Sequence, residues 1–150
     1  MKRKERFELI AIARKEKLNL IAEEVRKSLE VYPDLACKGG VKVIKQNTAL
    51  IMMRARDSVE KEVFNLGEVL VSEVWVEVNG VLGYSLVLGD DIEKALAGAI
   101  LDAVCELRHP LSEKIVNMLK EEKEYYEKER AKEWMRIKST KVEFEVMAKR

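Results

Sequence analysis

The sequence predicts an α+β fold in which helices pack on one face of an antiparallel sheet built on a hairpin. Two helical patterns open the chain, apolar and polar residues alternate over its middle, and Asn79-Gly80 separates two of the alternating runs. Asn-Gly is the strongest short hairpin signal, because a type I′ turn needs a positive φ at both central residues. A long charged helix and a closing edge strand complete the predicted order.

The 150 residues should form one domain with three parts. These parts are two N-terminal helices (1–31), a sheet with one helix (41–107), and a long helix with a terminal strand (110–150). Since 28 basic and 27 acidic residues give a net charge of +1, the chain is not a polycation that coats nucleic acid. Charged residues reach 37%, mainly Lys and Glu, a bias typical of hyperthermophiles. No apolar run is long enough to span a membrane and no secretory signal is evident, so we expect a cytoplasmic protein.

Apolar residues spaced three and four positions apart predict the two N-terminal helices. In the first helix, one face is expected to carry Phe7, Ile10, Ala11 and Arg14. The same spacing continues in the second helix at Leu18, Ile21, Ala22, Val25 and Leu29. Tyr32-Pro33-Asp34 should end this helix, because proline cannot supply the next backbone donor.

The middle of the chain has the alternation typical of strands. Residues 41–53 predict two short strands that join near Gln46-Asn47-Thr48. Alternation over 69–78 predicts a longer strand, and residues 81–88 form the strand that returns after the turn. The result is an antiparallel sheet.

A buried helix is expected to lie on this hairpin. Its apolar positions keep a helical spacing from Ile92 to Leu107. Asp90 and Glu93 stand at the spacing of a capping box, which predicts the start of the helix.

The last helix is predicted from Ser112 to about Lys138. Pro110 fits its first turn, and His109 is expected to cap a helix or to lie on the surface. The stretch is charged and sparsely apolar, so it is too polar for a monomer core and should project or rest on a partner. Thr140 to Met147 then alternates apolar and charged residues, which predicts a half-buried edge strand.

No catalytic constellation is evident. The chain lacks a nucleophile elbow and a glycine-rich phosphate loop, and with one histidine we expect no metal site of the usual zinc kind. Cys105 is expected to be a buried thiol, although a bridge to Cys37 stays open. Arg54 and Arg56 lie two residues apart on one face of a strand, where they could clamp a phosphate or simply form a solvated face.

Charge is unevenly distributed along the chain. Residues 38–56 carry five basic side chains and no acid, whereas residues 57–106 carry eleven acids against Lys61 and Lys94. Such segregation suits docking against other proteins or an anionic ligand. Aromatic side chains interleaved with basic ones are missing, so we expect no nucleic-acid partner.

Several sequence blocks occur in an order and at spacings typical of one known family. They are Phe64-Asn65-Leu66-Gly67-Glu68-Val69, Asn79-Gly80-Val81-Leu82-Gly83-Tyr84-Ser85, Val87-Leu88-Gly89-Asp90, the helix with Ala95, Ala99, Asp102 and Ala103, and the tail Thr140-Lys141-Val142-Glu143-Phe144-Glu145-Val146-Met147. With these blocks the chain resembles the PhnG subunit family of the bacterial carbon–phosphorus lyase core complex. The resemblance covers roughly residues 45–107 and 130–150, and the opening helices are similar only in layout.

The resemblance implies a subunit of a phosphonate-metabolising complex. In that family, a phosphonate such as methylphosphonate displaces adenine from MgATP, which gives α-D-ribose 1-methylphosphonate 5-triphosphate. It implies PhnI-like, PhnH-like, PhnJ-like and PhnL-like partners, with MgATP as a substrate of the complex and no cofactor bound by this chain. The family's nucleosidase chemistry is placed on PhnI, so this chain is expected to be a non-autonomous subunit of a pentosyltransferase-type synthase.

The matching blocks and the arginine pair supply the candidates for substrate or partner contact. These are Arg54, Arg56, Asn65, Glu68 and Tyr84. Glu68 is the candidate for catalysis, because a purely packing role would not call for a carboxylate. Two alternatives stay open: a purely structural subunit that stabilises a PhnI-like partner, and a stand-alone domain with another anion-binding role.

Overall fold

The computed structural model describes residues 1–31, 40–57 and 59–140 and has the predicted α+β architecture. Its elements are α1 (Arg3–Ile12), α2 (Lys15–Val31), β1 (Val41–Arg56), β2 (Val63–Val78), β3 (Val81–Leu88), α3 (Ile92–Glu106) and α4 (Ser112–Ser139). The strands form an antiparallel sheet in the order β1-β2-β3. The predicted closing strand begins at Thr140, which in the structure is the C-cap of α4. The rest of that predicted strand, residues 141–147, lies outside the described residues.

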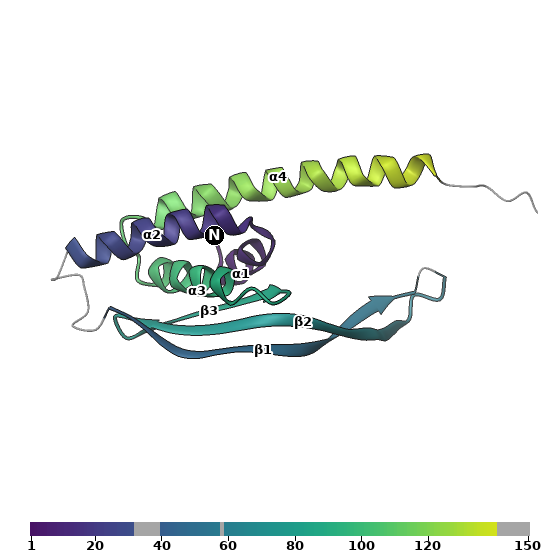
Figure 1. Cartoon of the computed structure of the whole chain (residues 1–150). Coiled ribbons are helices and arrows are strands. Elements are labelled where there is room, and N and C mark those ends of the chain that lie inside the picture. Colours follow the sequence, from purple (N-terminus) through teal and green to yellow (C-terminus); the bar gives the residue numbers. More distant parts are fainter. Residues whose placement is uncertain (32–39, 58, 141–150) are drawn as a thin grey trace, which may run out of the picture.

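The helices gather on one face of the sheet (Figure 1), as predicted. α3 packs on β2 and β3, α2 lies against α3, and α1 contacts both β3 and α4. The core between these layers consists of apolar side chains from the helices and from β2 and β3, among them Leu18, Val74, Ile100 and Leu119. β1 adds only the partly buried Val41 to this core.

The predicted hairpin is confirmed at Asn79-Gly80, where φ is 55° and 74°. β2 and β3 pair directly across this turn. On β2, Val74, Val76 and Val78 are fully buried on the face that α3 covers, and the residues between them are half-buried on the other face. The hairpin with α3 above it is therefore the centre of the fold, which we call the body.

Glycines allow α3 to lie very close to β3. A Cβ at Gly83 of β3 would collide with the carbonyl oxygen of Ala99, and a Cβ at Gly98 of α3 would collide with Ile10 and Ser85. Without side chains at these two positions, the helix and the strand can pack backbone against backbone.

The prediction of two short strands over 41–53 is wrong, because β1 is one continuous strand. It pairs with β2 along its length, as far as Arg56 opposite Val63. Gln46-Asn47-Thr48 contains no glycine or proline, so nothing forces a turn there, and pairing with the long β2 keeps the segment extended. β2 also begins at Val63, six residues before the alternation predicted it.

The start of α3 differs from the prediction by one residue. Its N-cap is Asp91 rather than Asp90, and Asp91 Oδ1 accepts a hydrogen bond from Lys94 N at 3.0 Å. The predicted capping box therefore does not form. Glu93 instead pairs with Lys15 of α2 at 2.7 Å, which ties the two helices together.

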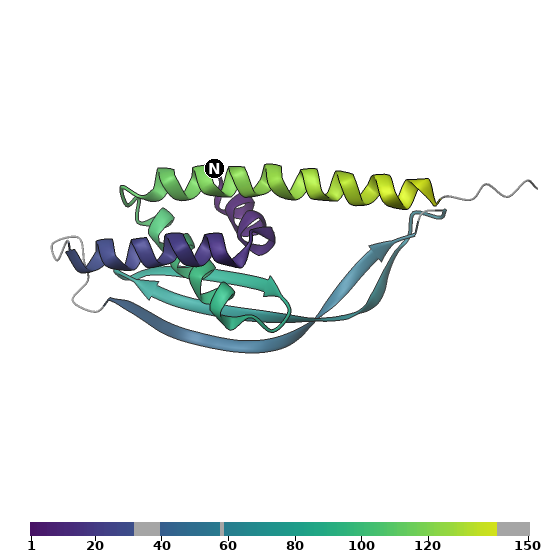
Figure 2. The same cartoon turned by 45° about the horizontal axis from the view of Figure 1, so that its top comes forward.

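The long helix α4 is packed in its first half and exposed in its second. It begins at Ser112, so Pro110 lies before the first turn in which it was predicted. The buried residues of α4 are Ile115, Met118, Leu119 and Glu122, all in the first half. Figure 2 shows the second half extending past the other helices. The predicted projection is thus confirmed for the second half only.

The buried face of α1 is rotated from the predicted one. Its buried members are Arg6, Leu9 and Ile10, and Arg14 beyond the helix end is exposed. The apolar spacing missed this face because it includes an arginine, whose burial depends on a carboxylate of α3 described below.

His109 and Cys105 both differ in burial from their predictions. His109 is buried rather than on the surface, and its Nδ1 accepts a hydrogen bond at 3.2 Å from the backbone N of Leu111. Leu111 is the N-cap residue of α4, and no side chain caps this helix, so His109 is not its cap. Cys105 is a half-buried free thiol, and burial raises its pKa to about 11. Cys37 lies outside the described residues.

Among the helices in the described ranges, none combines the length and the apolar character that crossing a membrane requires.

Candidate functional site on the β1–β2 arm

Beyond β3 the sheet continues as a two-stranded arm. β3 ends at Leu88, and the last hydrogen bond on that side of β2 within the described residues runs from Gly89 N to Leu70 O at 2.8 Å. We define the arm as residues 50–56 of β1 and 63–70 of β2, with the turn that joins them. At about 3.3 Å per residue, it extends roughly 25 Å from the body. Figures 1 and 2 show the arm curving toward the outer half of α4.

Apolar side chains are exposed on both faces of the arm. Leu50 and Met52 on one face are 59% and 51% exposed, and Ile51 and Met53 on the other are 38% and 41% exposed. On β2, the exposed apolar residues are Val63, Phe64, Leu66 and Leu70. An isolated two-stranded ribbon is marginally stable in water, and contiguous exposed apolar surface marks a protein–protein contact. The arm is therefore built to be covered.

The polar candidates on the arm share one of its faces: Arg54, Arg56, Asn65 and Glu68. Arg54 pairs with Asn65, and Met52 pairs with Glu68. Between these pairs, Leu66 is an extra residue of β2 with no partner on β1, which makes a β-bulge. The bulge shifts by one position which β2 side chains point to which face of the sheet. Because Met52 and Arg54 share a face of β1, their β2 partners share it too.

The four polar side chains of this set are exposed to solvent and have no polar contacts within the described residues. None of its side chains forms a hydrogen bond or ion pair with another described residue. Arg54 and Arg56 are about 7 Å apart along the strand, which lets two guanidinium groups contact one phosphate or two neighbouring ones. Asn65 can add an amide donor, and Glu68 a carboxylate that accepts a hydrogen bond or a proton. The arrangement suits an anion that carries several oxygens.

Tyr84 does not belong to this set. It pairs with Trp75 on the opposite face of the sheet, about 23 Å along β2 from Glu68. Its ring stacks on Phe7 at 5.4 Å and meets Trp75 at 4.4 Å between centroids. Burial, followed by the nearby Glu73 carboxylate, raises the pKa of Tyr84. In the isolated chain it therefore joins α1 to the sheet edge.

A buried carboxylate that was not predicted as a site residue lies at the junction of α1, α3 and β3. Asp102 is 2% exposed; its Oδ1 accepts from Arg6 Nη2 at 2.6 Å and its Oδ2 from Arg3 Nη2 at 2.7 Å. Oδ2 also accepts from the backbone N of Tyr84 at 3.2 Å. Arg6 reaches Glu106 as well, at 2.5 Å. A lone acid at a buried helical position, between Leu101 and Ala103, was the signal that could have revealed this cluster.

A second buried carboxylate joins α4 to the link between α1 and α2. Glu122 is 3% exposed and accepts from Arg14 at 2.6 Å through Nη2 and at 2.9 Å through Nε. These hydrogen bonds lower the pKa of Glu122 and raise that of Arg14. The Arg14 guanidinium also lies over the ring of Tyr125, 3.9 Å from its centroid. Both buried carboxylates are thus satisfied within the chain and are structural.

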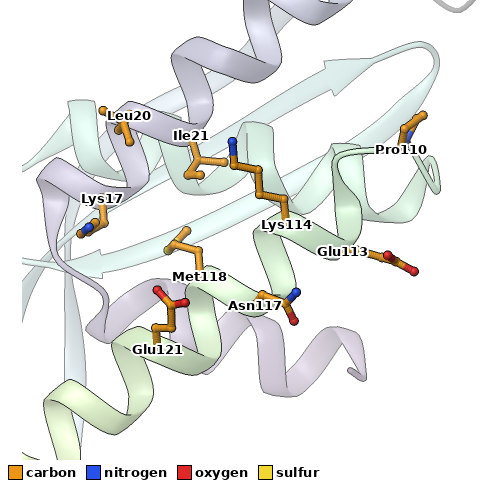
Figure 3. Close-up of a pocket in the computed structure, with 9 residues that line it drawn as sticks. All are labelled: Lys17, Leu20, Ile21, Pro110, Glu113, Lys114, Asn117, Met118 and Glu121. Carbon is orange, nitrogen blue, oxygen red and sulfur yellow. The ribbon is translucent and has the colours of Figure 1, made fainter.

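A groove of about 480 Å³ lies between α2 and α4 (Figure 3). Ile21 and Met118 form its apolar floor, while Lys17 and Glu121 stand at one end. Lys114 on its wall is already paired with Glu24 at 2.6 Å. The groove contains none of the predicted candidates, so the arm remains the candidate site.

A search of the curated proteins finds no sequence that matches this chain. The model of one protein family, described as "Phosphonate metabolism protein PhnG", matches residues 1–150, the whole chain. The match agrees with the blocks on β2, the hairpin and α3 that carry the resemblance. The chain therefore belongs to the PhnG family and is a phosphonate metabolism subunit.

Proposed function

We propose that this chain is a subunit of the synthase that displaces adenine from MgATP with a phosphonate such as methylphosphonate. The product is α-D-ribose 1-methylphosphonate 5-triphosphate. In this proposal the chain binds no cofactor of its own and has no activity alone. It works with PhnI-like, PhnH-like, PhnJ-like and PhnL-like subunits, and the PhnI-like subunit performs the nucleosidase step. Membership of the PhnG family supports this assignment.

The observation that carries the proposal is the arm. The exposed apolar residues on both faces of the arm need a protein partner to cover them. The polar set lies on one of those same faces and includes two basic side chains, Arg54 and Arg56. When a partner covers the apolar residues, Arg54 and Arg56 come to the interface with their donors free. There they bind phosphate oxygens of the triphosphate or of the phosphonate, and charge-assisted contacts of this kind favour bidentate geometry.

Reconstitution tests the proposal directly. The chain is combined with its PhnI-like, PhnH-like and PhnL-like partners, MgATP and methylphosphonate, and the reaction is followed by phosphorus NMR. The phosphonate ester signal should appear only when the chain is present. If ATP is merely hydrolysed to ribose triphosphate and adenine with and without the chain, the synthase assignment fails.

Variants of the polar set separate substrate contact from assembly. Arg54→Ala with Arg56→Ala should lower the synthase rate about 10- to 100-fold, the loss expected for charge-assisted hydrogen bonds. Lys42→Ala, on the same strand but in the body, is the matched control and should leave the rate unchanged. If Glu68→Gln keeps the full rate, the catalytic role of Glu68 is excluded.

The second candidate function is a purely structural subunit that stabilises a PhnI-like partner. The exposure of apolar residues on both faces of the arm favours it, because obligate interfaces resemble a core divided in two. In that case the arginine variants keep the synthase rate, and only changes to the apolar residues of the arm lower the yield of complex.

A further inference from the structure

The outer edge of β1 is unpaired within the described residues. β1 lies at one side of the sheet, and its 16 residues pair only with β2. Natural proteins rarely leave so long an edge open, since its free N–H and C=O groups pair readily with another strand. A strand that covers this edge is therefore expected.

The chemistry of β1 specifies that strand. β1 carries Lys42, Lys45, Arg54 and Arg56 and no acidic residue. In the arm, the basic positions alternate with the apolar Met53 and Ala55. Cross-strand pairs favour opposite charges and apolar contacts between directly opposed residues. The complementary strand must alternate acidic and apolar side chains.

This chain contains such a segment in Thr140–Met147, of which residues 141–147 lie outside the described residues. Glu143 and Glu145 alternate there with Val142, Phe144 and Val146. Figures 1 and 2 show that α4, which leads into it, ends on the side of the arm's tip, and that the last part of β1 lies on the α4 side of β2. Because β1 runs toward the tip, a segment returning from the tip would run antiparallel to it.

We propose that residues 143–147 pair antiparallel with the free edge of β1 along residues 52–56, with Glu143 opposite Arg56 and Glu145 opposite Arg54. The same register places Phe144 opposite Ala55 and Val146 opposite Met53. In this register, each glutamate of the tail faces an arginine of β1, and each apolar residue of the tail faces an apolar residue of β1. The tail adds a third strand to the arm, and three strands with an apolar face are stable where two are marginal.

This pairing is independent of the proposed synthase function. Each guanidinium has five N–H donors, so a carboxylate beside Arg54 or Arg56 leaves donors for an anion. The pairing also forms in the isolated chain, without substrate or partner subunits. The test of the pairing can therefore fail while the reconstitution of the synthase succeeds. The pairing can equally be confirmed while the reconstitution fails.

Disulfide trapping tests the register in the full chain. With Cys37→Ser and Cys105→Ala as background, Ala55→Cys and Phe144→Cys should form an intrachain bridge, since directly opposed residues have Cα atoms about 4.5–5.5 Å apart. The matched control, Ala55→Cys with Val146→Cys, is two residues out of register and should bridge at least 10-fold more slowly. Equal rates, or no bridge in either variant, overturn the proposal. A bridge only between two chains assigns the edge to a second copy and also overturns it.

Amide hydrogen exchange gives a second measurement that needs no engineered cysteine. Truncation after Thr140 should speed exchange of the outward-facing amides of residues 50–56 at least 10-fold, with α3 amides unchanged as the folding control. Glu143→Lys with Glu145→Lys should do the same, and adding Arg54→Glu with Arg56→Glu should restore the protection. Unchanged exchange overturns the proposal, as does protection that appears only when partner subunits are added.

Discussion

The body and the arm belong to the same strands, yet they differ in how their side chains are covered. Val74 of β2 is fully buried beneath the helices, while Leu50 of β1 is 59% exposed on the arm. In the body, buried carboxylates such as Asp102 are saturated by arginines of the same chain. On the arm, Arg54 and Arg56 have no partner among the described residues.

This contrast separates what the chain needs to fold from what it needs to function. The body has its own core and its own ion pairs, so its stability should depend on its own residues. Among the described residues, nothing covers the apolar surface of the arm or contacts its polar set, so its residues should matter for assembly and for anion binding. Substitutions in the two regions should therefore change different measurements.

The largest loss of stability is expected for Asp102→Ala in the body. The change leaves Arg6, which is 4% exposed, as a buried charge without its main partner. Removal of one member of a buried pair costs about 3–5 kcal/mol. Urea unfolding of the isolated chain measures the loss, and Lys42→Ala is an exposed control that should be neutral. A loss below about 1 kcal/mol would show that α1 is not held by this carboxylate.

Glu122→Gln should cost about 1.5–3 kcal/mol at neutral pH, because hydrogen bonds between charged groups are weakened. Arg14 holds the pKa of Glu122 below its usual range in the folded state. The stabilisation is therefore complete above the unfolded pKa of about 4.3 and is lost as the pH falls through the lower folded value. The difference in unfolding free energy between wild type and variant should shrink from pH 7 to about pH 3. A difference that is the same at both pH values contradicts the ion pair.

These body contacts show where sequence reasoning stops. The hairpin at Asn79-Gly80 and the helix α3 could be predicted because their signals are local: a turn dipeptide and a helical repeat. The pairing of Asp102 with Arg3 and Arg6 joins residues nearly a hundred positions apart, so no local pattern contains it. The long β1 was missed because its polar middle resembles a turn until the length of β2 is known.

The candidate site could be predicted in part. Two arginines on one face of a strand follow from alternation alone, and this part of the site is local. The bulge at Leu66 brings Asn65 and Glu68 onto that same face, and simple alternation would have separated them. Tyr84 was grouped with them because it lies in a neighbouring sequence block, but the sheet places it on the opposite face.

Gly83→Ala tests the close packing of the body and should cost about 1–3 kcal/mol, the range for overpacking in a core. The new methyl group would meet the backbone oxygen of Ala99, which cannot turn away as a side chain can. Ser85→Ala, two residues along β3, is the matched control. Its hydroxyl is buried without a hydrogen-bond partner among the described residues, so its removal should be neutral or slightly stabilising. Thermal unfolding compares the two, and equal losses would contradict the backbone contact.

The smallest effect on stability is expected for Leu50→Thr on the arm, and it gives the sharpest comparison with the body. An exposed substitution changes the unfolding free energy by less than about 0.5 kcal/mol, whereas Val74→Thr buries a hydroxyl and should cost about 1–3 kcal/mol. In binding to a PhnI-like partner, the order should reverse: Leu50→Thr should weaken the complex about fivefold or more, as expected for an interface residue worth over 1 kcal/mol. Calorimetry of binding, with folded variants only, measures this. If Leu50→Thr instead destabilises the isolated chain as much as Val74→Thr does, the arm belongs to the folding unit, and its exposed apolar surface is not a docking surface.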